Sequence, residues 1–198
     1  MLAAEESATA MPHPPAFQLP KAVFFDRDGT LIEHVPYLHD PAGVVLLPGV
    51  REAVAGLRAA GVKLFLFTNQ SGIGRGMFPL AAAEGVNRRL EQLLDPAGAV
   101  FTSTCIAAER PDEPSLYRKP SPRFILEMLA AHTTMPEQAW MLGDSPVDWE
   151  AGRAAGVHTA AIVPESLAAK DPRRREELNV VAYAGVLEWW NWVQGAKS

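Results

Sequence analysis

The chain has 198 residues, of which 48% are hydrophobic and 21% are charged, the balance of an ordinary globular protein long enough for one domain with a sizeable core. Its net charge of −5 provides no general basic surface for nucleic acid. The single cysteine, Cys105, excludes an intrachain disulfide and a cysteine-based zinc site, and suits a reducing cytoplasm.

The ends of the chain differ in character. Residues 1–19 combine small residues with prolines and have neither a basic segment nor an apolar segment of a signal peptide, so we expect a disordered tail. No apolar run approaches the roughly 18 residues of a membrane span. We therefore expect one domain over residues 20–198, with a cytoplasmic location, no membrane association, and a monomeric or homodimeric state.

Apolar segments alternate with helical patterns along this domain. The apolar segments predict strands over 22–25, 62–67, 99–106, 139–142 and 157–163, with a sixth over 180–183. Helical spacing predicts helices over 50–60, 80–94, from 121 onward, and over 148–155. A final helix bears Trp189, Trp190 and Trp192, which we expect to cover the core; exposed, they would instead form an oligomer contact. Arg173–Arg175 is interpreted as a solvated helix start.

This alternation predicts the fold class. Strands that alternate with helices form right-handed βαβ units, so we expect a Rossmann-like, doubly wound and mainly parallel sheet of five or six strands with helices on both faces. The connections that follow the first two strands are too short for a cap domain.

Two carboxylates follow the first strand directly. Asp26 and Asp28 end the apolar run 22–25 and precede Gly29 and Thr30. Residues two apart on an extended backbone point the same way, so both could serve one site. Paired carboxylates repel each other unless a cation or a shared proton relieves them, and Mg²⁺ favours oxygen ligands. Taken alone, the pair is equally compatible with a capping or turn role.

Polar residues recur where later strands end. Thr68 and Asn69 follow the second strand, Arg118 and Lys119 precede the third helix, and Gly143-Asp144-x-x-x-Asp148 follows the fourth strand. In a parallel sheet these strand ends share one edge. The combination fits phosphoryl transfer, which needs a nucleophile, charge neutralisation and protonation of the leaving group.

Each residue has an expected role in this chemistry. Asp26 is the candidate nucleophile and Asp28 the candidate acid and base. Thr68 and Lys119 would contact the phosphoryl oxygens. One Mg²⁺ per site is expected, with Asp26, Asp28 and Asp144 as its candidate ligands, and Asp148 would orient Asp144 or a metal-bound water.

These motifs resemble the haloacid dehalogenase superfamily of phosphohydrolases over about residues 20 to 165. D-R-D-G-T-L, T-N-Q-S-G-I-G-R-G, R-K-P and G-D-S-P-V-D are similar to its branch of heptose bisphosphate and histidinol phosphatases. The resemblance implies the family's capless type, and a small phosphate ester as substrate. It implies that Asn69 positions the nucleophile or binds substrate, and that Arg75 and Arg118 are candidate ligands of a second anionic group on the substrate.

Because the resemblance implies a capless type, substrate specificity in this chain is expected to lie in three loops, His34–Asp40, Ser71–Phe78 and Ala107–Leu116. Tyr37 and His39 are either substrate contacts or flap stabilisers. The zinc loop of the heptose bisphosphate and histidinol phosphatases precedes R-K-P, but here that segment keeps only Cys105 and has no histidine, so no zinc is expected and Cys105 is interpreted as a small buried residue.

Three functions remain in competition. A Mg²⁺-dependent phosphatase of a small metabolite is favoured, with a sugar bisphosphate such as heptose 1,7-bisphosphate first and histidinol phosphate second. A nucleic-acid 3′-phosphatase shares parts of the motifs, but the acidic charge and the lack of a basic or aromatic strip argue against nucleic acid as a partner. A signalling domain phosphorylated on Asp26 is disfavoured because Asp28 stands where an acid catalyst would speed turnover.

Overall fold

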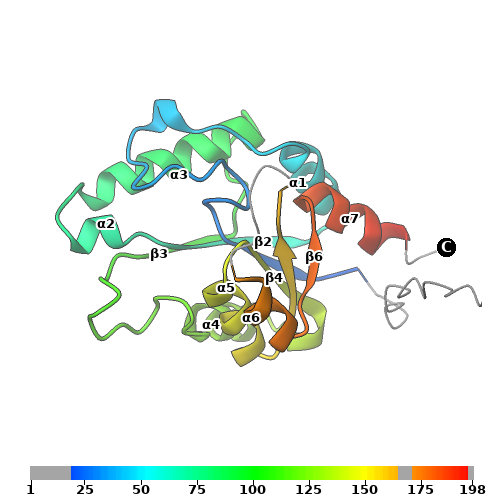
Figure 1. Cartoon of the computed structure of the whole chain (residues 1–198). Helices are drawn as coiled ribbons and strands as arrows, with labels where there is room; N and C mark the ends of the chain where they lie inside the picture. Colours follow the sequence, from blue (N-terminus) through cyan, green and yellow to red (C-terminus); the bar gives the residue numbers. More distant parts are fainter. Residues whose placement is uncertain (1–18, 165–170, 196–198) are drawn as a thin grey trace, which may run out of the picture.

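The computed structural model describes residues 19–164 and 171–195, and it has the predicted doubly wound α/β architecture (Figure 1). Within the described residues, the bounds of the elements are as follows. The strands are β1 Ala22–Phe25, β2 Lys63–Asn69, β3 Ser103–Ala107, β4 Ala139–Gly143, β5 His158–Ile162 and β6 Val181–Tyr183. The helices are α1 Val50–Ala59, α2 Ser71–Gly74, α3 Leu80–Leu94, α4 Arg123–Ala131, α5 Pro146–Ala154, α6 Pro172–Glu177 and α7 Val186–Gly195, with 3₁₀ turns η1 Pro41–Gly43 and η2 Pro136–Gln138.

All six strands are parallel and lie in the order β3-β2-β1-β4-β5-β6. The chain winds outward from β1 through β2 to β3, then returns to the other side of β1 to form β4. This reversal makes β1 and β4 neighbours, with Phe25 aligned to Leu142. In open α/β sheets the crevice for ligands lies beyond the carboxyl ends of the strands at such a reversal.

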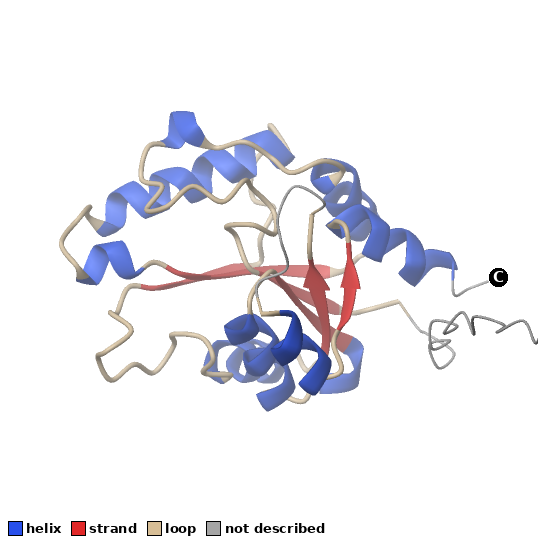
Figure 2. Cartoon of the chain, in the orientation of Figure 1, coloured by secondary structure: helices blue, strands red, loops and turns tan. Residues whose placement is uncertain are grey.

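Strand β1 is buried on both faces because its side chains alternate between two cores. Val23 and Phe25 pack into the larger core, whereas Ala22 and Phe24 pack into a second core on the other side of the sheet. Figures 1 and 2 show the matching layers, with α1, α3 and α7 on one face and α4, α5 and α6 on the other. A strand covered by helices on both sides reads as a continuous apolar run.

The carboxy-terminal tryptophans cover the core, as predicted. Trp189 is fully buried and Trp190 is 5% exposed, both in the larger core beneath α1. Gly56 of α1 permits the close approach, since a Cβ there would lie 2.4 Å from the Trp190 Nε1 atom. In α6 the interpretation of a solvated helix start is only partly right, because Arg174 is half-buried and pairs with Glu150.

Two strand boundaries differ from the prediction for physical reasons. Strand β3 starts four residues later than expected, because the amides of Val100 and Phe101 donate hydrogen bonds to Glu91 Oε1 on α3 and not to a neighbouring strand. Strand β2 extends to Asn69, so Thr68 and Asn69 are the last two residues of the strand and do not belong to the loop after it.

Helix boundaries depart from the prediction mainly where short-range capping decides them. Helix α5 begins at Pro146, two residues early, because the Ser145 and Asp148 side chains form a capping box around its first turn. The four-residue α2 lies within a segment predicted as loop. The predicted helix 80–94 is confirmed at both ends.

The connections on either side of β2 contain no additional domain within the described residues. Between β1 and α1 the only helix or strand within the described residues is the 3₁₀ turn η1, which follows the segment His34–Asp40, called the flap below. None of the described helices is long and apolar enough to cross a bilayer. The tail predicted for residues 1–19 lies, apart from Leu19, outside the described residues, and the single-domain division stays a prediction.

Candidate active site

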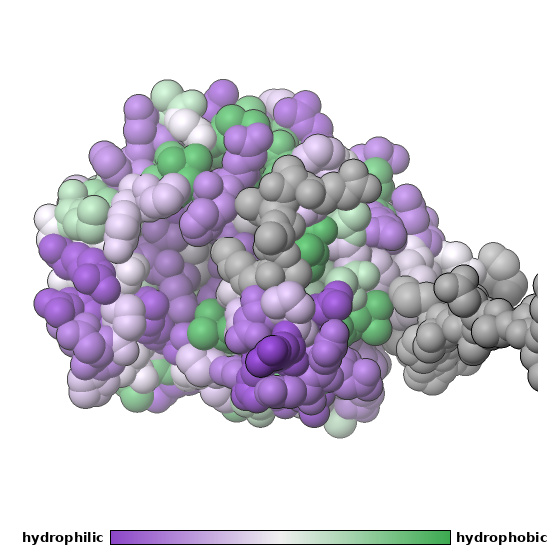
Figure 3. Space-filling view, in the orientation of Figure 1, coloured by the Kyte–Doolittle hydropathy of each residue, from purple (hydrophilic) through white to green (hydrophobic). Residues whose placement is uncertain are grey.

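A polar cleft of about 370 Å³ opens at the carboxyl ends of β1, β2 and β4. Figure 3 shows a mainly hydrophilic surface on this view of the molecule, with apolar residues scattered over it. The cleft is lined by predicted site residues, by the flap and by the start of α5: Asp26, Arg27, Asp28, His34, Val35, Pro36, Tyr37, Leu38, Asn69, Gln70, Ser71, Gly72, Lys119, Asp144, Ser145, Val147 and Asp148.

Lys119 is the cationic centre of this site. Its ammonium lies 2.6 Å from Asp26 Oδ1 and 2.6 Å from Asp148 Oδ1, and it donates to the Phe67 carbonyl at 2.8 Å. Burial alone would lower the pKa of Lys119, but the charges of Asp148 and Asp26 outweigh it, so the pKa is raised above its ordinary value. Lys119 therefore stays charged beside the candidate nucleophile.

Asn69 fixes the backbone of that lysine. Its Oδ1 accepts a hydrogen bond from the Lys119 amide at 3.0 Å, and its Nδ2 donates to the Lys119 carbonyl at 3.1 Å. Both polar atoms of the amide side chain are used in this clamp. The arrangement supports the positioning role expected for Asn69 over direct substrate binding.

Two glycines allow the acidic residues to approach the strand ends closely. A Cβ on Gly29, whose φ is +90°, would lie 2.1 Å from Asp144 Oδ2. A Cβ on Gly143 would lie 2.3 Å from the Asp148 Cβ. The loop after β1 and the start of α5 thus depend on glycine where they meet the carboxylates.

The donor set fits a hard divalent cation. Asp26, Asp144 and Asp148 are buried and each offers a carboxylate oxygen, with these atoms all within 4.8 Å of one another. Oxygen-only ligands of this kind suit Mg²⁺, whereas structural zinc prefers cysteine and histidine. Asp148 has both oxygens engaged: Oδ1 faces Lys119, and Oδ2 accepts from the Ser145 amide at 3.1 Å and its hydroxyl at 2.5 Å. This supports Asp148 as an orienting residue.

The Asp28 side chain lies outside that carboxylate group. It is paired with Arg27 at 3.0 Å, and Gln70 Nε2 donates to its Oδ2 at 2.9 Å. The same Gln70 nitrogen donates to Thr68 Oγ1 at 2.8 Å. Because that bond uses a lone pair of the hydroxyl, the Thr68 hydroxyl hydrogen is left to donate elsewhere. The Asp28 carboxylate is thus placed for proton transfer more than for metal binding.

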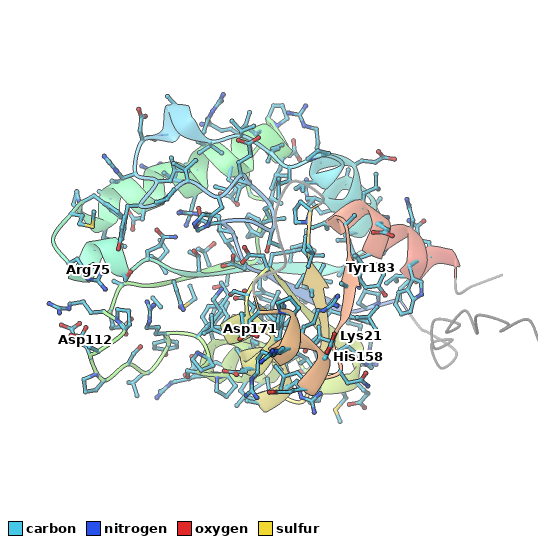
Figure 4. All side chains as sticks on the ribbon, viewed as in Figure 1. Lys21, Arg75, Asp112, His158, Asp171 and Tyr183 are labelled. Atoms are coloured by element: carbon cyan, nitrogen blue, oxygen red, sulfur yellow. The ribbon has the colours of Figure 1, made fainter. Side chains whose placement is uncertain are left out.

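Arg75 and Arg118 do not line the cleft. Arg118 is half-buried and donates from Nη1 to the Glu109 carbonyl at 3.1 Å; burial, together with the nearby Arg75 charge, lowers its pKa. Figure 4 shows Arg75 beside Asp112, at the end of the molecule opposite Tyr183. Both arginines belong to the rim formed by α2 and the loop 108–117, so a substrate would reach them only by extending out of the cleft.

The structure places the flap residues Tyr37 and His39, for which the sequence allowed either substrate contact or flap stabilisation, in different surroundings. Tyr37 lines the cleft, whereas His39 stacks on Phe78 at 5.4 Å and donates from Nδ1 to the Tyr37 carbonyl at 2.9 Å. His39 therefore stabilises the flap, and Tyr37 is the one placed for contact with substrate.

The loop before Lys119 is held by hydrogen bonds. Ser115 Oγ accepts from the Arg118 amide at 2.8 Å, and Ser121 Oγ donates to the Leu116 carbonyl at 2.6 Å. Cys105, predicted to be buried, is in fact half-buried, and its pKa is raised to about 12 by burial and then by the Glu109 charge.

Three site residues were not singled out from the sequence. Arg27 is part of the D-R-D motif and Gln70 is part of T-N-Q, but the motifs alone suggested no role for either residue. Asn87 of α3, which accepts a hydrogen bond from Arg27, carries no local sequence signal.

A buried lysine between two carboxylates, beside a group of acidic side chains that could hold a metal ion, lies at the reversal of a doubly wound sheet, which is the arrangement expected of an enzyme of phosphoryl transfer. The haloacid dehalogenase-like hydrolase model matches residues 40–156. The chain belongs to this hydrolase family.

Curated relatives agree with that membership, and a solved structure shares the fold. The D-glycero-beta-D-manno-heptose-1,7-bisphosphate 7-phosphatase of Mesorhizobium japonicum is 36% identical over 146 residues, 69% of this chain and 66% of that protein. The Pseudomonas putida enzyme of the same name is 33% identical over 143 residues, 72% and 82% of the two chains. The D,D-heptose 1,7-bisphosphate phosphatase of B. bronchiseptica, solved with magnesium and phosphate, has a TM-score of 0.77 at 22% identity, covering 88% and 98% of the two chains, and shares the fold.

Proposed function

We propose that this hydrolase is a Mg²⁺-dependent phosphomonoesterase acting on a small sugar bisphosphate, with heptose 1,7-bisphosphate as the first candidate. The observation that carries the proposal is the convergence of Asp26, Lys119 and Asp144 at one sheet edge, with Asp28 two residues beyond the nucleophile. The relatives named for heptose bisphosphate support the substrate class.

The first half of the reaction breaks the ester. An Asp26 oxygen attacks phosphorus, the bond to the leaving oxygen breaks, and Asp28 gives that oxygen a proton. The positive charge of Lys119, whose three N–H groups already serve Asp26, Asp148 and the Phe67 carbonyl, offsets the growing charge of the phosphoryl group, and the Thr68 hydroxyl donates to a phosphoryl oxygen. Mg²⁺, held by Asp26 and Asp144 with Asp28 kept as a further candidate, would neutralise the charge of the phosphoryl group.

The second half releases phosphate. Asp28, now a carboxylate, takes a proton from water while the water oxygen attacks the aspartyl-phosphate and the bond to Asp26 breaks. Lys119 remains beside Asp26 and Asp148 throughout the cycle, so the Asp26 carboxylate that is re-formed pairs with the Lys119 ammonium again. The chain ends each cycle in its starting state.

The cleft limits the substrate. A volume of about 370 Å³ admits a small phosphate ester, and the flap residues Val35, Pro36 and Tyr37 add apolar surface to the lining of the cleft. Arg75 and Arg118 lie on the rim and are proposed to meet a second anionic group of a longer substrate. A net charge of −5 provides little general attraction for nucleic acid, so we propose a small-molecule partner. A cytoplasmic location and a monomeric or homodimeric state remain expectations.

A substrate panel tests the proposal. Phosphate release from heptose 1,7-bisphosphate, other sugar phosphates, histidinol phosphate and a 3′-phosphorylated oligonucleotide is measured with and without Mg²⁺. We expect Mg²⁺-dependent release, highest with the sugar bisphosphate, and its loss in Asp26→Asn. Preference for histidinol phosphate or the oligonucleotide would overturn the substrate assignment, and full activity of Asp26→Asn would overturn the mechanism. Asp95→Asn, a change of the same type on the surface, is the control.

A further inference from the structure

Arg27, which separates the two site aspartates in the sequence, is a fully buried cation. Its side chain is 1% exposed, and a buried charge is tolerated only when it is paired and hydrogen-bonded. Arg27 Nε donates to Asp28 Oδ2 at 3.0 Å and Nη2 to Asp28 Oδ1 at 3.3 Å. The guanidinium therefore faces the candidate acid and base, while Asp26 is served by Lys119.

A second contact connects Arg27 to helix α3, which is distant in the sequence. Its Nη1 donates to Asn87 Oδ1 at 2.9 Å, and Asn87 is a buried polar residue of α3, 60 positions along the chain. A polar side chain among the apolar residues of α3 needs a partner to offset its burial. The Asn87 contact holds the planar guanidinium in one orientation relative to the sheet.

The bonds to Asp28 are unequal for its two oxygens. Oδ2 accepts from Arg27 Nε at 3.0 Å and from Gln70 Nε2 at 2.9 Å, whereas Oδ1 has the longer contact of 3.3 Å with Nη2. A carboxylate oxygen that accepts two good hydrogen bonds has little capacity for a proton. Oδ1 is therefore the oxygen with more lone-pair capacity left for a further partner.

We propose that Arg27, held by Asn87, is a positioning residue that, with Gln70, anchors Asp28 through Oδ2 and presents Oδ1 as the oxygen that exchanges the proton with the leaving group and water. The proposal rests on the proposed phosphatase function and adds an assignment to its acid and base.

The proton balance follows from this assignment. As the ester bond breaks, its electron pair goes to the leaving oxygen, which takes the hydrogen of Asp28 Oδ1. The carboxylate that remains is stabilised by the Arg27 guanidinium already in contact with it. In the second half, Oδ1 takes a proton from the attacking water, and the contact with Arg27 is that of the starting state again.

Leaving-group dependence separates positioning from a purely structural role. A sugar alcohol leaves poorly unless it receives a proton, whereas p-nitrophenolate leaves as an anion and needs none. A residue that places the acid therefore matters for the first kind of ester only. A residue that merely supports the fold affects both kinds equally. The ratio of kcat/KM values reports only the steps up to cleavage of the ester, so hydrolysis of the aspartyl-phosphate does not interfere.

The experiment compares Arg27→Met with wild type in Mg²⁺, using the best sugar phosphate of the panel and p-nitrophenyl phosphate. We expect kcat/KM to fall about 100-fold or more for the sugar phosphate and less than about 5-fold for the aryl ester, and we expect the same pattern for Asp28→Ala. Arg27→Lys, which keeps the charge, should recover part of the loss. Arg89→Met, an exposed arginine of α3, is the matched control and should leave both values unchanged.

A second variant covers the case in which Arg27→Met fails to fold, judged by its melting transition. Asn87→Ala removes only the anchor, and we expect the same selective loss at smaller size, with the exposed Gln92→Ala as control. Equal losses on both esters, or none, would overturn the proposal. Wild type inactive on both esters would instead overturn the proposed function, a result visible before any variant is made.

Discussion

Lys119 Nζ lies 2.6 Å from Asp148 Oδ1, so the lysine beside the candidate nucleophile is shared between two carboxylates. Asp148 is fully buried, and its other oxygen caps the first turn of α5. The Gly143 position, where a Cβ would lie 2.3 Å from the Asp148 Cβ, permits this packing. Asp148 thereby links helix α5 to Lys119, the cation that also pairs with Asp26 after β1.

Removing the Asp148 carboxylate should therefore cost both stability and activity. In Asp148→Ala, Lys119 loses one of its two buried partners and α5 loses its cap, and we expect a destabilisation of about 3 kcal/mol. Urea unfolding measures the change. Asp95→Ala, which breaks an exposed pair with Arg58, is the control, and its effect should be much smaller. Equal losses of unfolding free energy in the two variants would show that the buried pair of Asp148 and Lys119 stabilises the fold no more than an exposed pair does.

Lys119→Met should make stability near neutrality depend more strongly on pH, with stability rising as the pH falls. Without the ammonium, two buried carboxylates face each other, and kcat should fall about 100- to 1,000-fold through loss of charge stabilisation. Burial raises the pKa of Asp148 above its unfolded value even with the lysine present, with Asp26 adding to the rise. A raised folded-state pKa favours the protonated form, so the variant's stability should increase as the pH is lowered from 7 toward 5.

The measurement is urea unfolding of Lys119→Met and wild type in EDTA at several pH values. We expect the difference in unfolding free energy between wild type and Lys119→Met to become smaller as the pH falls. A difference that becomes larger on acidification would contradict the assigned role of the Lys119 charge. Lys63→Met, at an exposed position of β2, provides the control.

The Cys105 thiol should be unreactive in the folded protein. Burial raises its pKa from 9.0 to about 12, so the thiolate is scarce at pH 8, and each unit of pKa is a factor of ten. We expect iodoacetamide to label the folded chain roughly 100-fold or more slowly than the chain in urea. The stabilising contribution of the neutral thiol is complete below pH 9.0 and should be lost as the pH rises toward about 12. Equal labelling rates in the two states would refute the shift.

The parts of the fold that the sequence predicted are those set by local pattern. Apolar runs gave β1 and β4 almost to the residue, and α3 was predicted at both ends, because burial on both faces or on one stripe decides these elements. The shared edge of the motifs followed from the geometry of parallel strands.

What the sequence could not predict depends on contacts between distant residues. The Glu91 carboxylate captures the amides that would otherwise have extended β3, and the Arg27 guanidinium reaches Asn87 on α3. Neither contact leaves a trace in the spacing of nearby residues. The same holds for the Asp148 contact with Lys119, because the sequence suggested only that Asp148 would orient Asp144 or a metal-bound water.

Gly29 offers the sharpest test of the metal site, because a control with the same backbone strain exists. Gly29→Ala places a Cβ 2.1 Å from Asp144 Oδ2 at a φ of +90°, whereas Gly61→Ala places one at +76° with nothing within 4 Å. Both should lose about 1 kcal/mol from left-handed strain. Only Gly29→Ala displaces the Asp144 carboxylate, so only it should need a higher Mg²⁺ concentration for half-maximal activity, about tenfold or more if the loss of binding exceeds 1.4 kcal/mol. Melting curves and Mg²⁺ titrations of phosphate release, with calorimetric Mg²⁺ binding as an independent readout, measure the two effects. A normal Mg²⁺ requirement in Gly29→Ala would mean that Asp144 does not hold the ion.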